Sequence, residues 1–218
     1  IAGWIEDLSR LPGVEEIDVW LTENLHEQGG CRCADCAKED YAVLESRVVV
    51  AAWRQAQKTR PVGLRVLTSE ETEKSNPRIL AELPPEVKLW YYHSLLTYMT
   101  SERPMVRDYL IEPARTGRWI GMVPNLVPIH FALPSTTPQF MHYRMNEFVD
   151  RKMAGLLGYV TPRVHYAEFN IEAAAEWSWN AAGRSPREFA LSWAVRQGLS
   201  DPETFAEWTE ALGPGTWN

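Results

Sequence analysis

Short hydrophobic stretches recur along the chain, and each is followed by residues with helical spacing. The stretch Glu15 to Thr22 alternates Ile17, Val19 and Leu21 with other residues, which predicts a strand. Similar stretches predict strands over 62–68, 87–93, 118–123 and 155–161. Hydrophobic residues three to four positions apart predict helices between them, over 38–57, 77–83, 104–115 and 138–152.

Both ends of the chain have helical patterns. Residues 1–13 read as the tail of an amphipathic helix, so we expect this chain to be part of a longer protein. That stretch leaves the compartment open: periplasmic or secreted, or cytoplasmic. Beyond the fifth strand, helices are predicted over 166–182, 186–197 and 202–212. Ser185-Pro186 and Asp201-Pro202 are start signals for the last two helices.

The alternation of strands and helices predicts an α/β fold with parallel βα repeats. The strands begin about 35 residues apart, close to the roughly 31 residues of one unit in a (β/α)8 barrel. Five such units fit either an open doubly wound sheet or the second half of a TIM-type barrel. Neither GxGxxG nor GxxxxGK[ST] occurs, which favours the barrel. We expect a single α/β unit over 1–218, with 166–212 as its helical closing segment.

The composition is that of an ordinary globular domain. Of 218 residues, 45% are hydrophobic and 23% are charged, which excludes a disordered chain. The net charge of −7 argues against a nucleic-acid partner held by bulk positive charge. The longest hydrophobic runs fall far short of the roughly 18 residues that span a bilayer, so we expect no membrane partner. The ten tryptophans are unusual, because Trp often forms binding floors for sugars, bases or cations as well as cores.

Polar residues stand at the carboxyl ends of the predicted strands, where catalytic groups of parallel α/β folds gather. Glu23 and Asn24 follow the first strand, His93 ends the third, Asn125 follows the fourth and Thr161 ends the fifth. Each has an ordinary alternative: a solvent-facing Glu, a packed and hydrogen-bonded His, or a turn Asn. For the aromatic residues at 90–92 we expect core packing rather than a sugar platform.

Several motifs together resemble a known family. Glu23-Asn24 at a strand end precedes a glycine-containing loop, the motif CxCxxC and Ser46-Arg47-Val48, and Trp179-Asn180 precedes Ser185-Pro186. This pattern resembles an uncharacterised bacterial glycoside-hydrolase-like barrel family, a domain of unknown function related to hexosaminidase and α-glucuronidase barrels. The resemblance is close over about 15–55 and 176–197 and elsewhere concerns only the order of elements. It implies that the chain covers strands four to eight of the barrel and acts on carbohydrate.

The resemblance also implies a catalytic residue. The related hexosaminidase barrels carry Asp-Glu at this strand end, with the Glu as general acid, whereas the family itself tends to carry Asn-Asp and this chain has Glu23-Asn24. Glu23 is therefore the candidate acid. Cleavage of a glycosidic bond needs a second carboxyl group or a substrate amide. The candidate partners are Glu70, Glu71, Glu168 and Glu172. The expected substrate-binding residues are Asn24, His93, Asn125 and Glu70.

All three cysteines lie in one short motif, at Cys31, Cys33 and Cys36. Thiolates on a tight loop suit zinc or another soft cation, and His26 would complete a tetrahedral set of ligands. Four protein ligands leave no open position, so the metal would be structural and would brace the loop that carries Glu23. A disulfide with one free thiol, or three reduced packed thiols, are the alternatives. No organic cofactor is expected.

Two functions of different classes follow. The first is a glycosidase that uses carboxylate acid/base catalysis. The second is a barrel remnant that binds carbohydrate or a partner without cleaving it. A second strand-end carboxylate within about 5–10 Å of Glu23 would favour the enzyme. Five barrel strands leave open edges and an apolar inner face at Val19, Val66 and Leu157, so we expect a homo-oligomer or association with the remainder of the same barrel.

Overall fold

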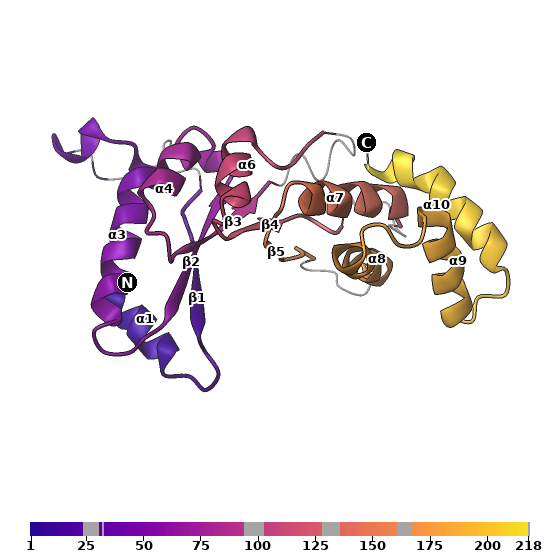
Figure 1. Cartoon of the computed structure of the whole chain (residues 1–218), viewed down its shortest axis with the longest axis horizontal. Coiled ribbons are helices and arrows are strands. Elements are labelled where there is room, and N and C mark those ends of the chain that lie inside the picture. The colour runs from indigo at the N-terminus through magenta and orange to yellow at the C-terminus, as the bar shows by residue number, and fades with distance from the viewer. Residues whose placement is uncertain (24–30, 32, 94–102, 128–135, 161–166, 218) are drawn as a thin grey trace. The chain divides into compact units, whose positions relative to one another are not determined.

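A computed structural model describes residues 1–23, 31, 33–93, 103–127, 136–160 and 167–217, the last five by their backbone alone. Its five parallel strands form one sheet with the order β1-β2-β3-β4-β5, so each strand lies beside its neighbours in sequence (Figure 1). The strands are β1 (Glu16–Trp20), β2 (Gly63–Ser69), β3 (Lys88–Tyr92), β4 (Ile120–Val123) and β5 (Gly155–Leu156). The α/β class and the five predicted strands are confirmed.

Helices occur where hydrophobic periodicity predicted them. They are α1 (Ala2–Ser9), α3 (Tyr41–Ala56), α4 (Asn76–Glu82), α6 (Asp108–Arg115), α7 (Pro138–Asp150), α8 (Glu168–Trp179), α9 (Pro186–Arg196) and α10 (Pro202–Trp217). Two short 3-10 helices, η1 (Cys36–Lys38) and η2 (Glu70–Thr72), were not predicted. No helix among the described residues is long and apolar enough to cross a membrane.

The chain divides into two compact units. The first unit contains Ile1–Tyr92 and Gly117–Gly121, and the second contains His93–Thr116 and Met122–Asn218. In the first unit, α1, α3 and α4 lie beside β1 and β2 (Figure 1). The side of these strands that carries Ile17 and Leu64 is buried. Trp53 of α3 anchors this layer, because its buried Nε1 donates a hydrogen bond to the Val62 carbonyl at 2.7 Å.

The opposite side of the same strands is polar and aromatic. Asp18 accepts hydrogen bonds from Arg65 at 2.7 Å and from the indole of Trp90 at 3.0 Å, and Lys88 forms an ion pair with Glu16. The expectation of an uncovered apolar inner face at Val19 and Val66 is therefore wrong. The two residues pair in the register on the side that carries Ile17 and Leu64, where Val19 is half-buried and Val66 fully buried.

An aromatic cluster holds the carboxyl-terminal helices of the second unit together. Phe169 of α8 contacts the rings of Phe189 and Trp193 of α9 at centroid distances of 5.3 and 5.2 Å, and that of Phe205 of α10 at 5.9 Å. The predicted helix start at Ser185 is confirmed as a capping box with Glu188. Residues of α8 and α9 in this helical layer also line an open pocket.

Candidate functional site

The carboxyl end of β1 is fixed by contacts with α3. The backbone N–H and the hydroxyl of Thr22 donate hydrogen bonds to the two carboxylate oxygens of Glu45, at 2.9 and 2.7 Å. Leu21, the residue before, is buried and donates its N–H to the Leu67 carbonyl at 3.0 Å. These contacts hold the backbone from which Glu23 projects. Glu45 was missed by sequence reasoning, because its helical position gives no sign of a partner 23 residues away.

Glu23 lies at the end of this clamped segment and is half-buried. Its Oε1 atom is shielded from solvent and accepts no hydrogen bond from any residue that the structure describes. A buried carboxylate oxygen usually has a hydrogen-bond donor, so Glu23 Oε1 is an exception among the described residues. Asn24, the predicted neighbour in substrate binding, lies outside the described residues.

An aromatic pair stands beside this strand end. Trp20, the last residue of β1, is 42% exposed and lies on the same side of the strand as Glu16 and Asp18. Its ring meets that of Tyr92, the last residue of β3, edge to face at a centroid distance of 5.2 Å. Trp20 therefore has a fixed orientation and an accessible surface. Tyr92 is mostly buried, which agrees with the predicted packing role.

Glu70 takes the equivalent place after β2. Trp20 of β1 and Leu67 of β2 are partners in the parallel register. Glu23 follows Trp20 by three residues, and Glu70 follows Leu67 by three residues. Glu70 opens η2 and is half-buried. The turn behind it is rigid, because Asn76 donates to the Ser69 carbonyl at 2.9 Å and accepts from the Thr72 hydroxyl at 2.7 Å.

The remaining strand-end candidates belong to the second unit. His93 is half-buried directly after β3. Asn125 is fully buried and forms a parallel bridge with Tyr159. Buried Asn170, which the sequence did not single out, donates to the Leu126 carbonyl at 2.8 Å and so fixes the chain that follows Asn125. Thr161 lies outside the described residues.

The other candidate carboxylates have different environments. Glu71 is exposed, and its N–H donates to the Ser69 hydroxyl at 3.3 Å. Glu168 is exposed in the first turn of α8. Glu172 is held by Arg196 at 2.6 Å. Of the proposed partners, Glu70 therefore has the position most like that of Glu23.

The three cysteines converge, as the motif predicted. The Sγ atoms of Cys31, Cys33 and Cys36 all lie within 4.8 Å of one another, and all three are free thiols. In a tetrahedral zinc site with Zn–S bonds of about 2.3 Å, the sulfurs lie about 3.8 Å apart. The separations of the three sulfurs are therefore compatible with ligation of one such ion. His26, the predicted fourth ligand, lies outside the described residues.

A backbone N–H group stabilises the thiolate form of one cysteine in this cluster. The N–H of Cys36 donates to the Sγ of Cys33 at 3.5 Å, and the N–H of Ala37 donates to the Cys33 carbonyl at 3.0 Å. The Cys36 N–H, followed by the Cys31 side chain, lowers the pKa of Cys33 to about 7. The hydrogen bonds of Cys36 with Cys33 and then Cys31 raise the pKa of Cys36 to about 11. The thiolate of Cys33 is therefore favoured, whereas ionisation of Cys36 beside it is disfavoured. A bound cation would favour the thiolate form of both.

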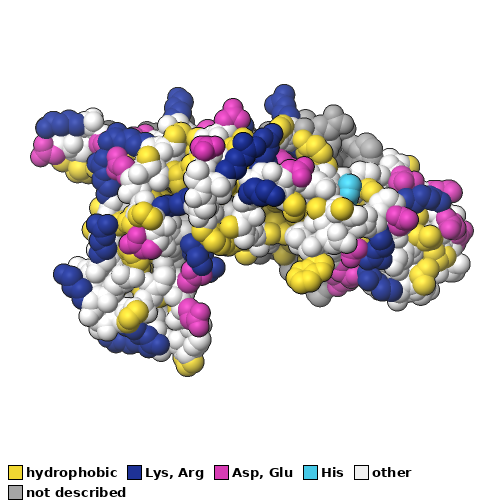
Figure 2. Space-filling view, viewed as in Figure 1, with side chains coloured by type: hydrophobic (Ala, Val, Ile, Leu, Met, Phe, Trp, Pro, Cys, Tyr) yellow, Lys and Arg dark blue, Asp and Glu magenta, His cyan; other side chains and the backbone are white. Residues whose placement is uncertain are grey.

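A network of charges follows the cluster in sequence. Glu39 accepts hydrogen bonds from Arg78 of α4 and lies 3.3 Å from Arg47 of α3. Both arginines also contact Glu82, at 2.7 and 2.9 Å. The segment that ends the cysteine loop is thereby attached to two helices. On the face drawn in Figure 2, side chains of both signs are interspersed.

No family model and no curated protein sequence matches the chain. The assignment of function therefore depends on the geometry of the cysteines and of the strand ends.

Proposed function

We propose that the chain is strands four to eight of a glycoside-hydrolase-like (β/α)8 barrel and that it acts on carbohydrate. The sheet order carries this proposal. In a barrel, each strand lies beside the next one in sequence, whereas doubly wound sheets reverse their order at a switch point. The order β1-β2-β3-β4-β5 has no such reversal among the described strands.

In this proposal Glu23 is the general acid, and Glu70 on the adjacent strand is the second carboxylate. Glu23 has an open acceptor oxygen and a backbone held by the contact of Thr22 with Glu45. Trp20 offers an exposed ring beside it, suited to the apolar face of a sugar. Asn24, His93 and Asn125 remain the proposed additional substrate contacts.

The test is hydrolysis of a panel of unactivated oligosaccharides, whose alkoxide leaving groups need a proton, by Glu23→Gln, which keeps the side-chain shape but removes the acid. We expect kcat to fall about 100-fold or more, the range for loss of a general acid. The matched control is Glu15→Gln, at the exposed amino end of the same strand. Turnover unaffected by Glu23→Gln would refute its catalytic role. Sugar binding without turnover would instead identify a non-catalytic carbohydrate-binding barrel.

We also propose that Cys31, Cys33 and Cys36 hold a structural zinc ion, with His26 as the fourth ligand. The supporting observations are the convergence of three free thiols and the N–H that faces Cys33. Thiolate ligands are those that zinc prefers in structural sites, and a closed coordination shell would brace the loop after β1. The proposed metal has no part in bond cleavage.

Metal analysis of protein purified without chelator tests this site. One zinc per chain is expected, with most of it lost in Cys33→Ser and retained in Asp35→Asn, which alters an exposed carboxylate of the same loop. Hydrogen exchange should increase in the loop after β1 more than in β2 when the metal is lost. A metal-free protein with a disulfide between two of the cysteines would contradict the proposal.

A further inference from the structure

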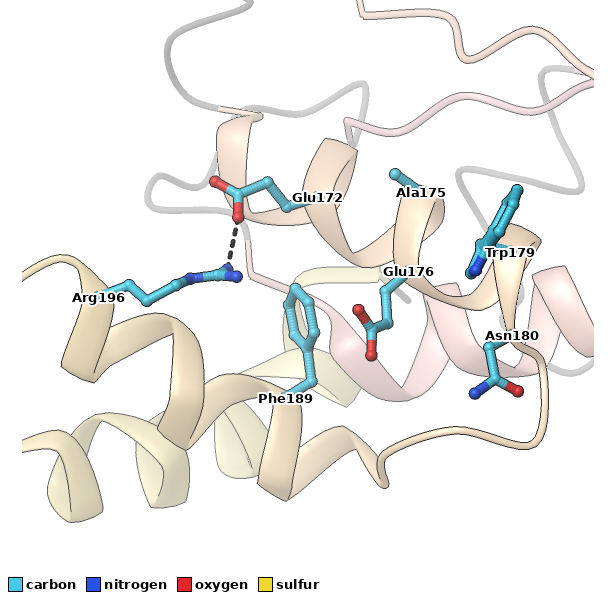
Figure 3. A pocket seen from close by; sticks show the side chains of 7 residues that line it. All are labelled: Glu172, Ala175, Glu176, Trp179, Asn180, Phe189 and Arg196. Carbon is cyan, nitrogen blue, oxygen red and sulfur yellow. Dashed lines mark hydrogen bonds and ion pairs between the residues drawn. The ribbon is translucent and has the colours of Figure 1, made fainter.

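A pocket lies between α8 and α9 of the second unit (Figure 3). Its volume of about 430 Å³ lies in the range of small-molecule sites, roughly 300–1,000 Å³. Its lining includes Glu172, Glu176 and Trp179 of α8, Asn180 after it, and Phe189 and Arg196 of α9. Glu172 was a candidate partner of Glu23 in the sequence; the other residues of this lining belong neither to the strand-end candidates nor to the cysteine cluster.

Trp179 is the unusual member of this lining. It is 93% exposed, more than any other large hydrophobic side chain that the structure describes. Its neighbour Trp177 on the same helix is fully buried and donates its indole N–H to the Arg184 carbonyl at 2.8 Å. Trp177 is therefore part of the core of the unit, whereas Trp179 lies in solvent at one end of the pocket (Figure 3). An exposed indole can contact a ligand through its flat apolar face.

The charged groups of the pocket are already paired. Arg196 contacts Glu172 at 2.6 Å, and Arg184 contacts both oxygens of Glu176 at 2.8 Å. The hydrogen bond from Arg184 holds the pKa of Glu176 below its usual value, so this carboxylate stays ionised. These pairs fix the oxygens in place while leaving lone pairs for further donors. The amide of Asn180 adds both a donor and an acceptor.

This combination excludes several classes of ligand. A quaternary ammonium group needs a cage of aromatic rings, and here the second ring, Phe189, is buried with the guanidinium of Arg184 over its face, 5.5 Å from the ring centroid. A nucleotide would bring its phosphate against Glu172 and Glu176. A stable protein interface needs a larger apolar centre than Trp179 alone supplies.

We propose that this pocket binds an uncharged sugar ring, stacked on Trp179. A pyranose has an apolar C–H face for the indole and hydroxyl groups that can donate to Glu176 and exchange hydrogen bonds with Asn180. The pocket is open, so the ring can be one residue of a longer chain. This binding site stands on its own residues and does not depend on the proposed cleavage of glycosidic bonds.

The experiment follows the indole N–H signal of Trp179 by NMR, assigned by its disappearance in Trp179→Phe. The probes are methyl β-glucoside, N-acetylglucosamine and xylose, with their β-1,4-linked tetrasaccharides. We expect saturable shifts with at least one tetrasaccharide, and at least 10-fold weaker binding by calorimetry in Trp179→Ala. Trp4→Ala, which removes another exposed indole from α1, should bind as the wild type does. Because Trp179 is exposed, its variants should keep the wild-type melting temperature.

The proposal is overturned if no probe moves the Trp179 signal at millimolar concentration. It also fails if Trp179→Ala binds as tightly as the wild type, or if choline or AMP shifts the signal and the sugars do not. Sugar binding at Trp179 in a protein without hydrolytic activity would support this site and count against the proposed enzyme. Hydrolysis that depends on Glu23, without sugar binding at Trp179, would support the proposed enzyme and count against this site.

Discussion

Gly121 in β4 is required by a single close approach. A Cβ atom at this position would lie 2.1 Å from one ring carbon of Trp90 and 2.2 Å from another. Trp90 cannot turn away without cost, because its indole donates to Asp18 at 3.0 Å and its ring contacts Trp119 edge to face at 4.8 Å. On this polar and aromatic side of the sheet, the ring of Trp90 occupies the space that a side chain at position 121 would need.

Gly121→Ala should therefore destabilise the protein by about 2 kcal/mol or more, within or above the usual cost of overpacking. Urea unfolding measures this change. The control is Gly3→Ala on α1, where nothing lies within 4 Å of the added Cβ and alanine is the better helix former. Equal unfolding midpoints for Gly121→Ala and the wild type would show that Trp90 is free to move.

At the scale of elements, ion pairs connect α3 and α4 with the end of the cysteine loop. Glu39 of that loop contacts Arg47 of α3 and Arg78 of α4. Arg47 and Arg78 both donate hydrogen bonds to Glu82. These bonds lower the pKa of Glu82 to about 2, compared with the usual value near 4.5. The folded state thus favours the ionised carboxylate. This contribution to stability is present above about pH 4.5 and is lost as the pH falls through about 2.

Glu82→Gln should lower the urea midpoint at pH 7 and leave it nearly unchanged at pH 2, where Glu82 itself becomes protonated. The difference at pH 7 should be small and should shrink in high salt, because the network is exposed. Glu86→Gln, on the exposed loop after α4, serves as the control. A difference that stays constant from pH 7 to pH 2 would rule out this electrostatic explanation.

At the scale of the whole molecule, the sheet order gives β1 and β5 one neighbouring strand each among the described residues. Unpaired backbone groups on such edges favour association with another chain. On β1, the edge strand of the first unit, Trp20 is also exposed. In such an association, the edge strand would form backbone hydrogen bonds with the other chain, and Trp20 would bury apolar surface.

We therefore expect the purified chain to form a homo-oligomer, unless the remainder of the same barrel covers these edges. Sedimentation equilibrium over a range of concentrations tests this expectation. Trp20→Lys should shift the distribution toward monomer, whereas Trp4→Lys, on α1, should not. A compact, monodisperse monomer of 25.0 kDa would contradict association and would weaken the half-barrel proposal.

Short-range patterns in the sequence determined the elements and part of the candidate site. Alternation over a few residues predicted β1, helical spacing predicted α3, and Ser185-Pro186 predicted the start of α9. The cysteine cluster was predictable for the same reason, because Cys31 and Cys36 are only five residues apart and a short loop brings their sulfurs together.

Only the tertiary structure decided the contacts that depend on where the chain returns. Glu45 clamps Thr22 across 23 residues, and Asn170 fixes Leu126 across 44. The sequence contained Trp177 and Trp179 two positions apart, yet burial of one and exposure of the other follow from how α8 packs. Periodicity identifies a helix and its apolar side, but long-range packing selects which polar groups meet and which aromatic ring remains available to a ligand.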